Sequence, residues 1–335
     1  MKLKSLVAAL LLLASELVPG AARCEVNEVT IAQQFGVAFL PLMLMERDGL
    51  VEKHAKAAGL TLKTNWQKVA GPSVINDGLL SGTVHFGAVG APSLVTLWSK
   101  TKSNVGVKGM AAMTSYPLYF VTRNPELKSL KDLSARDKIA VPSVKISTQA
   151  LMLQMAAADL FGQSSYQKFD EFTVSLAHPD ALIALTNNTS GVNAHFSTSP
   201  FYEAEMKLPG ARVLTTSYDI LGGRASALVV IATSKFHDAN PKVYKAFLDA
   251  EKEAIEIINR DKKKAAQDYL TIAQDKKSTL EEIYNVINDK DYAYTLSPEK
   301  VFKTAVFMGK VGTIKDPPAK WQDLFFSDIH DLPGD

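Results

Sequence analysis

Two helix starts flank one buried strand in residues 71–97, and this arrangement constrains the fold more than any other part of the chain. The tripeptides GPS at 71–73 and APS at 91–93 each place proline at the first position of an expected helix. Between them, the apolar segment 84–90 predicts a buried strand that ends in glycine. Both helices therefore begin near one sheet edge, where their free N–H groups and positive dipole ends favour a small anionic or hydrogen-bond-accepting ligand.

Strand and helix patterns alternate through the first 120 residues. Alternating or continuous apolar segments predict strands at 28–33, 62–69, 84–90, 106–114 and 118–123. Helical patterns lie between them, including one that begins at Pro41 and ends at Gly59. This order is typical of a largely parallel sheet with helices on its faces.

The same alternation continues in a second unit and ends in helices. Further strands are predicted at 138–142, 171–176, 191–196, 213–216 and 222–231. Helices are predicted to begin at 147–148, 179, 200, 240–241, 278 and 297–298. We expect an α/β chain of two lobes with two mixed, mostly parallel sheets flanked by helices. Lobe 1 would span 25–120 plus 222–335 and lobe 2 would span 121–221, with two crossings made by the strands at 118–123 and 226–231.

The N-terminus predicts an export signal at 1–24. Lys2 and Lys4 precede a continuous apolar run at 6–13, which is too short to span a bilayer, and small residues follow at 20–22. We therefore expect a secreted, periplasmic protein. A lipid anchor on Cys24, the only cysteine, is disfavoured because the preceding residue is an arginine and not a small residue.

Charge and motifs exclude several classes of function. The formal net charge is +2, and it falls to zero without residues 1–24, so we expect no nucleic-acid partner. The sequence holds no G-x-S-x-G, H-E-x-x-H or GxxxxGK[ST] motif, and its six histidines have no metal-ligand spacing. We expect no catalytic residues, no metal and no cofactor, and therefore no enzyme.

Four segments together resemble one known family. They read VTIAQQFGVAFLPLMLMERDGLVEKHAKAAGL, GPSVINDGLLSGTVHFGAVGAPSLV, KIAVPSVKISTQALMLQMAAADLFG and HPDALIALTNNTSGVNAHFSTSPFYEAE, and they cover much of residues 27–315. In this order, behind an export signal, they are similar to the periplasmic substrate-binding proteins of ABC importers for nitrate, sulfonates such as taurine, and thiamine-pyrimidine precursors.

The resemblance implies a two-lobed binding protein of the type II periplasmic fold. Its lobes would close on a ligand by a hinge motion, and the closed form would dock on a membrane permease that works with an ATPase. We expect a monomer that binds a small organic anion, either a sulfonate or a carboxylate. A pyrimidine or thiamine precursor, an inorganic anion, and a sensor role without transport are the alternatives. A pyrimidine-synthesising enzyme of this fold is disfavoured by the export signal and by the absence of a further cysteine.

The candidate ligand-binding residues follow predicted strands or begin predicted helices. In the resembled family such loops and helix starts line the cleft between the lobes. The candidates in the first part of lobe 1 are Gln34, Phe35, Phe39, Gly71, Ser73, Gly90, Ser93 and Tyr116. Those in lobe 2 are Ser147, Thr148 and His195, and Arg224 lies just before the strand that returns to lobe 1.

Each candidate also has a purely structural interpretation. The phenylalanines could belong to the core, and the serines and threonine could be plain helix caps. His195 could be a buried structural histidine, and Arg224 could form an ion pair between the lobes or at the hinge instead of binding a ligand carboxylate or sulfonate.

Overall fold

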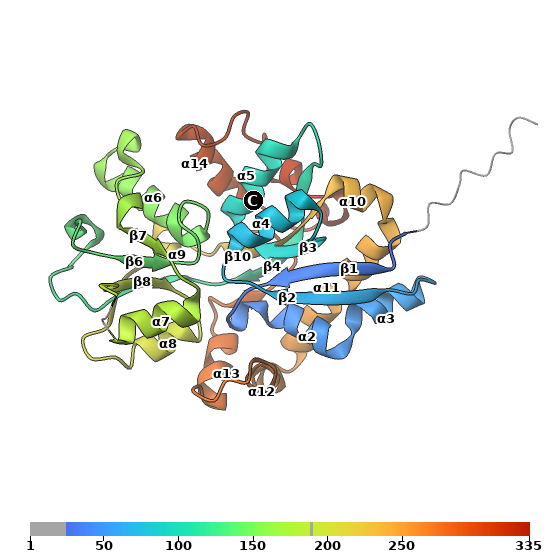
Figure 1. The fold of residues 1–335 in the computed structure, drawn as a ribbon, viewed down its shortest axis with the longest axis horizontal. Coiled ribbons are helices and arrows are strands. Elements are labelled where there is room, and N and C mark those ends of the chain that lie inside the picture. The colour runs from blue at the N-terminus through green and yellow to red at the C-terminus, as the bar shows by residue number, and fades with distance from the viewer. Residues whose placement is uncertain (1–24, 188–189) are drawn as a thin grey trace, which may run out of the picture.

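The computed structural model describes residues 25–187 and 190–335, which form two sheets with helices around each (Figure 1). The predicted export signal at 1–24, including Cys24, lies outside the described residues. We call the part of the chain built on the first sheet lobe 1 and the part built on the second sheet lobe 2.

The first sheet has six strands in the order β11-β4-β10-β3-β1-β2. Their bounds are β1 (Glu28–Gln33), β2 (Lys63–Lys68), β3 (Phe86–Val89), β4 (Val107–Ser115), β10 (Ser226–Thr233) and β11 (Ala293–Tyr294). Strand β1 pairs in parallel with β2 and β3, whereas β10 runs antiparallel to both β3 and β4. Strands β1 to β4 therefore run one way, and only β10 and β11 oppose them.

The second sheet has five strands in the order β7-β6-β8-β5-β9. Their bounds are β5 (Tyr119–Thr122), β6 (Ile139–Val141), β7 (Thr173–Ser175), β8 (Ala194–Ser197) and β9 (Arg212–Thr216). Strand β6 is parallel to β7 and β8, and β5 is antiparallel to β8 and β9. Both sheets are thus mixed and mostly parallel in direction, as the strand–helix alternation predicts.

Helices cover both sheets. Those of lobe 1 are α2 (Leu40–Asp48), α3 (Leu50–Ala57), α4 (Pro72–Ser81), α5 (Ala91–Thr101), α10 (Ser234–Ala239), α11 (Pro241–Arg260), α12 (Lys262–Ala273), α13 (Leu280–Asn288) and α14 (Val301–Lys310). Those of lobe 2 are α6 (Thr148–Phe161), α7 (His178–Asn187), α8 (Phe201–Glu205) and α9 (Ser217–Leu221). Short 3-10 turns lie at η1 (Val37–Phe39), η2 (Leu130–Asp132), η3 (Gln163–Ser165), η4 (Asp170–Phe172), η5 (Trp321–Leu324) and η6 (Ser327–Ile329).

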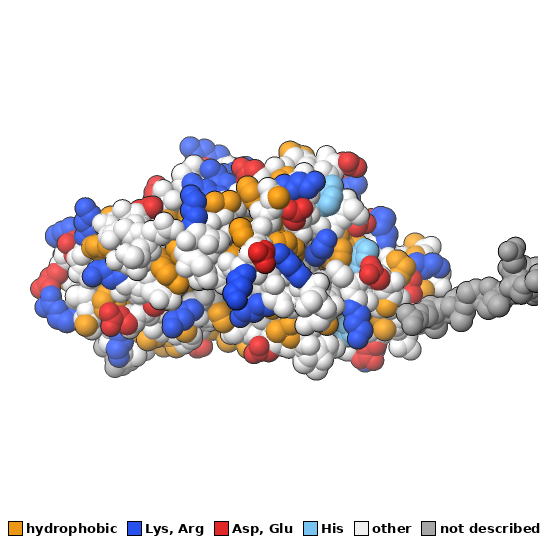
Figure 2. All heavy atoms as spheres, turned by 90° about the horizontal axis from the view of Figure 1, so that it is seen from above, with side chains coloured by type: hydrophobic (Ala, Val, Ile, Leu, Met, Phe, Trp, Pro, Cys, Tyr) orange, Lys and Arg blue, Asp and Glu red, His pale blue; other side chains and the backbone are white. Residues whose placement is uncertain are grey.

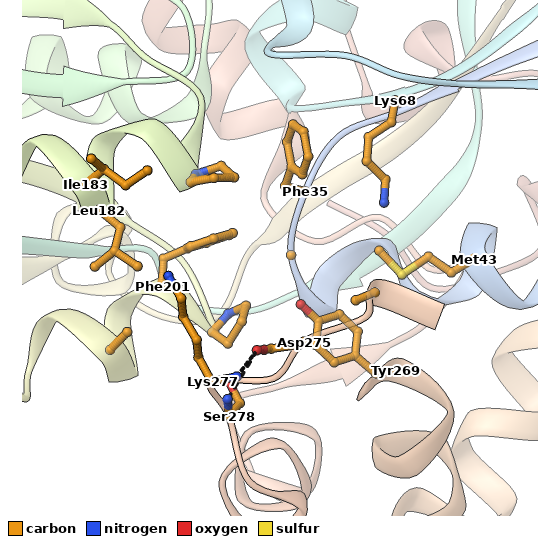
Figure 3. A pocket seen from close by; sticks show the side chains of 15 residues that line it. Phe35, Met43, Lys68, Leu182, Ile183, Phe201, Tyr269, Asp275, Lys277 and Ser278 are labelled. Carbon is orange, nitrogen blue, oxygen red and sulfur yellow. Dashed lines mark hydrogen bonds between the residues drawn. The ribbon is translucent and has the colours of Figure 1, made fainter. Parts of the chain in front are cut away.

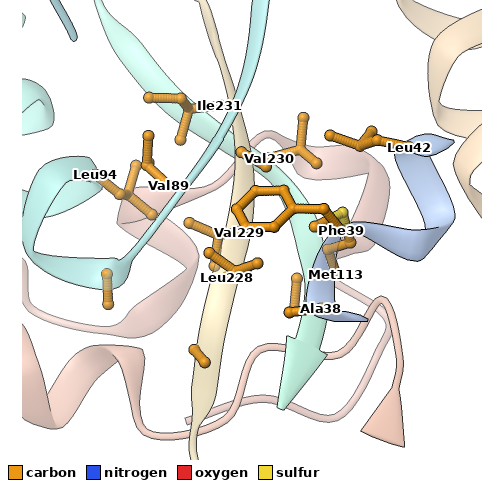
Figure 4. Packing of buried hydrophobic residues seen from close by; sticks show 14 of the residues in the cluster. Ala38, Phe39, Leu42, Val89, Leu94, Met113, Leu228, Val229, Val230 and Ile231 are labelled. Atoms are coloured by element: carbon orange, nitrogen blue, oxygen red, sulfur yellow. The ribbon is translucent and has the colours of Figure 1, made fainter. Parts of the chain in front are cut away.

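The core of lobe 1 surrounds β10, which lies between β3 and β4. Its residues Leu228, Val229, Val230 and Ile231 pack between helices on the two faces of the sheet, with Phe39 on one side (Figure 4). All four are buried, which explains why this strand consists of consecutive apolar residues and does not alternate.

The chain passes between the two sheets twice. It leaves the first sheet at the end of β4 and enters the second at β5, and it returns through α9 to β10. These passages are short, and they hold the lobes side by side (Figure 1). The exact boundaries between lobe 1 and lobe 2, predicted at 120/121 and 221/222, remain predictions.

Some element bounds differ from those predicted because of glycines with positive φ. Gly49, at φ 59°, divides the helix predicted over 41–59 into α2 and α3. Gly222 and Gly223, at φ 71° and 124°, end helix α9, so the strand predicted from 222 begins only at Ser226. These backbone angles lie outside the helical and strand regions for other residues, and they interrupt regular structure.

Candidate functional site

A small cavity lies between the two lobes. Its volume is about 30 Å³, which is enough for one or two water molecules. Lobe 1 contributes Gln34, Phe35, Phe39, Pro72, Gly90, Tyr116, Leu118, Ala227 and Leu228, and lobe 2 contributes Pro142, Ser147, Thr148, Gln149, His178 and Thr198. We call this space the inter-lobe cavity.

Four helices of ten or more residues begin at the inter-lobe cavity. Pro72 is the first residue of α4, and Gly90 is the N-cap of α5. Ser147 is the N-cap of α6, where its Oγ accepts a hydrogen bond from the backbone N–H of Ala150 at 3.3 Å, and His178 is the first residue of α7. Their positive ends meet in one buried space, so its electrostatic potential favours negative charge.

Seven predicted candidates line this cavity. The structure brings together Gln34, Phe35, Phe39, Gly90, Tyr116, Ser147 and Thr148 from both lobes. Gln34 is buried, and its amide Nε2 donates to the carbonyl oxygen of Ala88 at 3.4 Å. Tyr116 stacks on Tyr292 with ring centroids 5.1 Å apart, and burial raises the pKa of its hydroxyl to about 12.

The other predicted candidates lie elsewhere. Ser93 is buried beside the cavity, where its Oγ accepts from the amide Nδ2 of Asn76 at 3.3 Å. Arg224 is not among the residues that line the cavity. Its Nε donates to Oε2 of Glu299 at 3.0 Å within lobe 1. Ser73 contacts the opposite lobe, with its Oγ 3.0 Å from Oγ of Ser143.

Glycines lie at close contacts between the lobes around the cavity. A Cβ at Gly71 would lie 2.5 Å from the carbonyl oxygen of Pro142, and a Cβ at Gly90 would lie 1.9 Å from Oγ1 of Thr148. A Cβ at Gly36, whose φ is 117°, would lie 3.0 Å from the carbonyl oxygen of Ser199. A residue with a side chain at these positions would hold the lobes apart, so Gly71 serves the contact between lobes and not the cavity wall.

His195 lies behind the cavity in a buried hydrogen-bonded series. Its Nε2 is 2.8 Å from Nδ1 of His178, and its Nδ1 is 2.5 Å from Oε1 of Glu205. His195 and Glu205 are fully buried, whereas His178 reaches the cavity. The sequence therefore pointed to His195 as a ligand-binding candidate and missed His178, which faces the cavity.

The sequence missed three polar residues of the cavity wall: Gln149, His178 and Thr198. His178 begins a helix directly after a short strand, which is the same signal that pointed to Ser147 and Thr148. Gln149 lies one residue beyond that pair. Thr198 is 2% exposed, and its position after β8 brings it to the same wall.

The wall of the cavity carries hydroxyl, amide and imidazole groups but no lysine or arginine among the described residues. A negative charge there would be balanced by helix N-termini and by hydrogen-bond donors, and not by an opposing side-chain charge. No group of three or more His, Cys, Asp or Glu side chains in residues 25–187 and 190–335 is arranged to hold a metal ion.

Phe35 also lines a larger apolar groove, which is shown in Figure 3. Its volume is about 270 Å³. Leu182, Ile183 and Phe201 face it from lobe 2, and Met43 and Tyr269 face it from lobe 1. Lys68, Asp275 and Lys277 add charge at its edge. We call this space the outer groove.

The surface carries no dominant charge on the face shown in Figure 2, where lysine and arginine side chains alternate with aspartate and glutamate. Within the described residues, no helix is both long and apolar enough to cross a membrane.

Comparisons with known proteins agree with this architecture. The family model described as NMT1/THI5 like matches residues 56–265. No curated protein matches the sequence.

Solved structures share the fold at low sequence identity. The alkanesulfonate-binding protein SsuA from Xanthomonas axonopodis pv. citri bound to MOPS has a TM-score of 0.64 at 16% identity, covering 88% of this chain and 96% of that chain. The periplasmic aliphatic sulphonate binding protein SsuA from Escherichia coli has a TM-score of 0.63 at 16% identity, with 90% and 93% covered. The periplasmic nitrate-binding protein NrtA from Synechocystis PCC 6803 has a TM-score of 0.66 at 15% identity, with 89% and 84% covered. The predicted two-lobed fold is confirmed.

Proposed function

This chain belongs to the NMT1/THI5-like family, and we propose that it is a solute-binding protein that delivers a small molecule to an ABC permease and its ATPase. Its structural neighbours include sulfonate-binding and nitrate-binding proteins of the periplasm, which supports this role and an extracytoplasmic location. We propose further that it is exported through residues 1–24, acts as a monomer without enzymatic activity, and has no nucleic-acid partner.

The observation that carries the proposal is the meeting of four helix N-termini at one buried cavity between the lobes. Oriented N–H dipoles stabilise a negative charge without requiring it to be paired with a side chain. The ligand would therefore be a small organic anion, a sulfonate or a carboxylate, whose charged head occupies the inter-lobe cavity.

The outer groove supports an apolar part on this anion. Since Phe35 lines both spaces, a ligand whose head lies beside Thr148 would extend past Phe35 towards Leu182 and Phe201. Apolar surface buried there would stabilise the complex by about 25 cal/mol per Å². In this closed arrangement the cavity itself admits little more than water, so ligand entry requires the lobes to separate.

A thermal-shift screen of the mature protein tests the proposal. The panel contains methanesulfonate, hexanesulfonate, taurine, acetate, benzoate, nitrate and a hydroxymethylpyrimidine. At about a hundredfold excess over the dissociation constant, a ligand stabilises the folded state by about 2.7 kcal/mol, which raises the melting temperature by several degrees. Stabilisation by the pyrimidine alone, with none by any anion, would contradict the anionic ligand but not the solute-binding role.

A pyrimidine precursor is the second candidate ligand. Phe201 stacks on His178 with ring centroids 5.7 Å apart, and Phe35 lies across the groove, so aromatic surfaces are available for a flat heterocycle. An inorganic anion such as nitrate would use the cavity and leave the outer groove empty. Transport and sensing are distinguished by uptake of the labelled ligand in cells with and without the neighbouring permease.

A further inference from the structure

Three buried side chains form a continuous series from the interior of lobe 2 to the inter-lobe cavity. Oε1 of Glu205 on α8 lies 2.5 Å from Nδ1 of His195 on β8, and Nε2 of His195 lies 2.8 Å from Nδ1 of His178. The remaining ring nitrogen of His178, Nε2, lies 3.4 Å from Nε2 of Gln149, which lines the cavity. We call Glu205, His195 and His178 the carboxylate–histidine relay.

The hydrogen bonds of the relay determine what His178 presents to the cavity. If each ring carries one proton and His195 carries it on Nδ1, His195 donates to Glu205 through Nδ1 and accepts from His178 through Nε2. Nε2 of His178 is then an acceptor. One additional proton on the relay turns Nε2 into a donor, and the single imidazolium charge that results is offset by the buried carboxylate.

The surroundings of His178 disfavour a proton when the cavity holds no anion. Its position at the start of α7 places it at a positive helix end. Burial, and next the neighbouring His195, lower the pKa of His178 well below its usual value. Among the described residues, the titratable groups that face the relay are Glu203 on α8 and Tyr116 across the cavity. Burial raises the pKa of Glu203, and the pKa of Tyr116, about 12, keeps its hydroxyl neutral.

An arriving anion reverses this preference. Without the additional proton, the anion and the fully buried carboxylate of Glu205 would be two negative charges in one desolvated region. A proton on the relay offsets one of these charges and provides a donor at Nε2 of His178, a residue that lines the cavity. Binding of an anion and binding of a proton therefore stabilise each other.

We propose that His178 is a ligand-binding residue, that its Nε2–H donates to the anion, and that the carboxylate–histidine relay takes up one proton when the anion binds. The proton comes from the buffer acid, which remains as its conjugate base. His195 and Glu205 are positioning residues, since they act through His178. The inference rests on the proposed function, because it requires an anionic ligand.

Calorimetric titration of the mature protein with methanesulfonate, benzoate and nitrate tests the inference. Bis-tris and Tris are the buffers, because sulfonate buffers could occupy the site. We expect uptake of about one proton per bound anion, seen as a dependence of the binding enthalpy on the ionisation enthalpy of the buffer. The affinity should rise as the pH falls from about 8 to 6, by about tenfold per pH unit wherever one whole proton is taken up on binding.

Two variants separate a proton-linked role from a structural one. Glu205→Gln keeps an oxygen that accepts from His195 but removes the charge that balances the added proton, so the pH dependence of affinity should become flat. Glu251→Gln is the matched control, because Glu251 is also fully buried but lies on α11 in lobe 1, outside the residues that line the cavity. This control should retain the pH dependence of the wild-type protein.

The outcomes distinguish the two proposals. If an anion binds with the same affinity throughout this pH range and without proton uptake, the relay inference is wrong and the solute-binding role stands. If Glu205→Gln folds and retains the full pH dependence, Glu205 has no part in it and the relay inference is likewise wrong. If none of the three anions binds, both the anionic ligand and the relay inference fail.

Discussion

Gly90 of lobe 1 lies so close to Thr148 of lobe 2 that a Cβ at position 90 would be 1.9 Å from Oγ1 of Thr148. No two non-bonded heavy atoms approach to this distance, so the observed contact between the lobes requires glycine at this position. Both residues line the inter-lobe cavity, and each stands at the start of a helix. The lack of a side chain at Gly90 therefore leaves the backbone N–H groups at this helix start open to the cavity and also sets how closely the lobes approach.

Gly90→Ala should weaken ligand binding without destabilising the free protein. The added methyl group cannot fit beside Thr148 when the lobes are closed, and overpacking of this kind costs about 1–3 kcal/mol. That cost corresponds to a loss of affinity of about 5- to 150-fold, measured by calorimetric titration with the best anion of the thermal-shift panel. The melting temperature of the ligand-free protein should change little, because open lobes do not make this contact.

Thr148→Ala in the Gly90→Ala background provides the control. Removal of Oγ1 opens the space that the new methyl group needs, so the double variant should bind more tightly than additivity of the two single variants predicts. Strictly additive losses would show that the contact between positions 90 and 148 does not limit closure.

Glu251→Gln should stabilise the protein at alkaline pH. Glu251 is fully buried on α11, neither carboxyl oxygen has a hydrogen-bond partner in the described structure, and burial raises its pKa well above the ordinary value of 4.5. Since the folded state holds this proton more tightly than the unfolded state, the stabilising effect is complete below pH 4.5 and decreases as the pH rises towards the folded pKa.

Between the unfolded and the folded pKa of Glu251, the free energy of unfolding falls by about 1.4 kcal/mol per pH unit because of this one group. Urea unfolding of the wild-type protein and of Glu251→Gln across the window measures the difference between the two slopes. Identical slopes for the two proteins would mean that Glu251 is ionised, or already hydrogen-bonded, in the folded state.

Arg224→Ala should leave ligand affinity within about twofold of the wild-type value. The sequence suggested that this arginine binds the anion, but its Nε donates to Glu299 at 3.0 Å and it does not line the inter-lobe cavity. Its side chain is 39% exposed, so the pair should contribute less than about 1 kcal/mol to stability. Glu299→Ala should have the same small effect, and a loss of affinity above about tenfold for Arg224→Ala alone would instead support contact with the ligand.

Phe35→Ala should weaken the binding of hexanesulfonate or benzoate more than that of methanesulfonate. Phe35 lines both the inter-lobe cavity and the outer groove, so its ring would cover the apolar part of a long ligand but little of a short one. Loss of roughly half of a buried phenylalanine contact costs about 1 kcal/mol or more, which is about fivefold or more in affinity. Phe161→Ala, at an exposed phenylalanine of lobe 2 outside both spaces, should change neither affinity.

Much of the architecture was predictable because strands and helices depend on neighbouring residues. The hydrophobic period and the glycine and proline positions placed all strands except the two-residue β11, and they placed the helix starts at Pro72, Ala91 and Thr148. Errors occurred where a local pattern was ambiguous. Gly49 and Gly222 interrupt otherwise regular patterns, and their backbone angles follow from how the chain must turn to reach its tertiary contacts.

The site was predictable only in part, because a helix start can be identified in a sequence but the direction of its side chain cannot. Ser147 and Thr148 line the inter-lobe cavity, whereas Ser73 contacts Ser143 and Ser93 contacts Asn76. All four have the same local signal, a small hydroxyl residue at the beginning of a helix.

The sequence by itself determined the order of the elements, the family and the presence of several helix N-termini suited to an anion, since these depend on short segments of chain. Only the tertiary structure decided which charged or titratable side chains remain available to contact a ligand. It pairs Arg224 with Glu299, 75 residues away, and it places His178 between His195 and the cavity. Such partners are separated along the chain and meet only when the lobes fold, because hydrogen bonds and ion pairs depend on distance in space and not on order in the sequence.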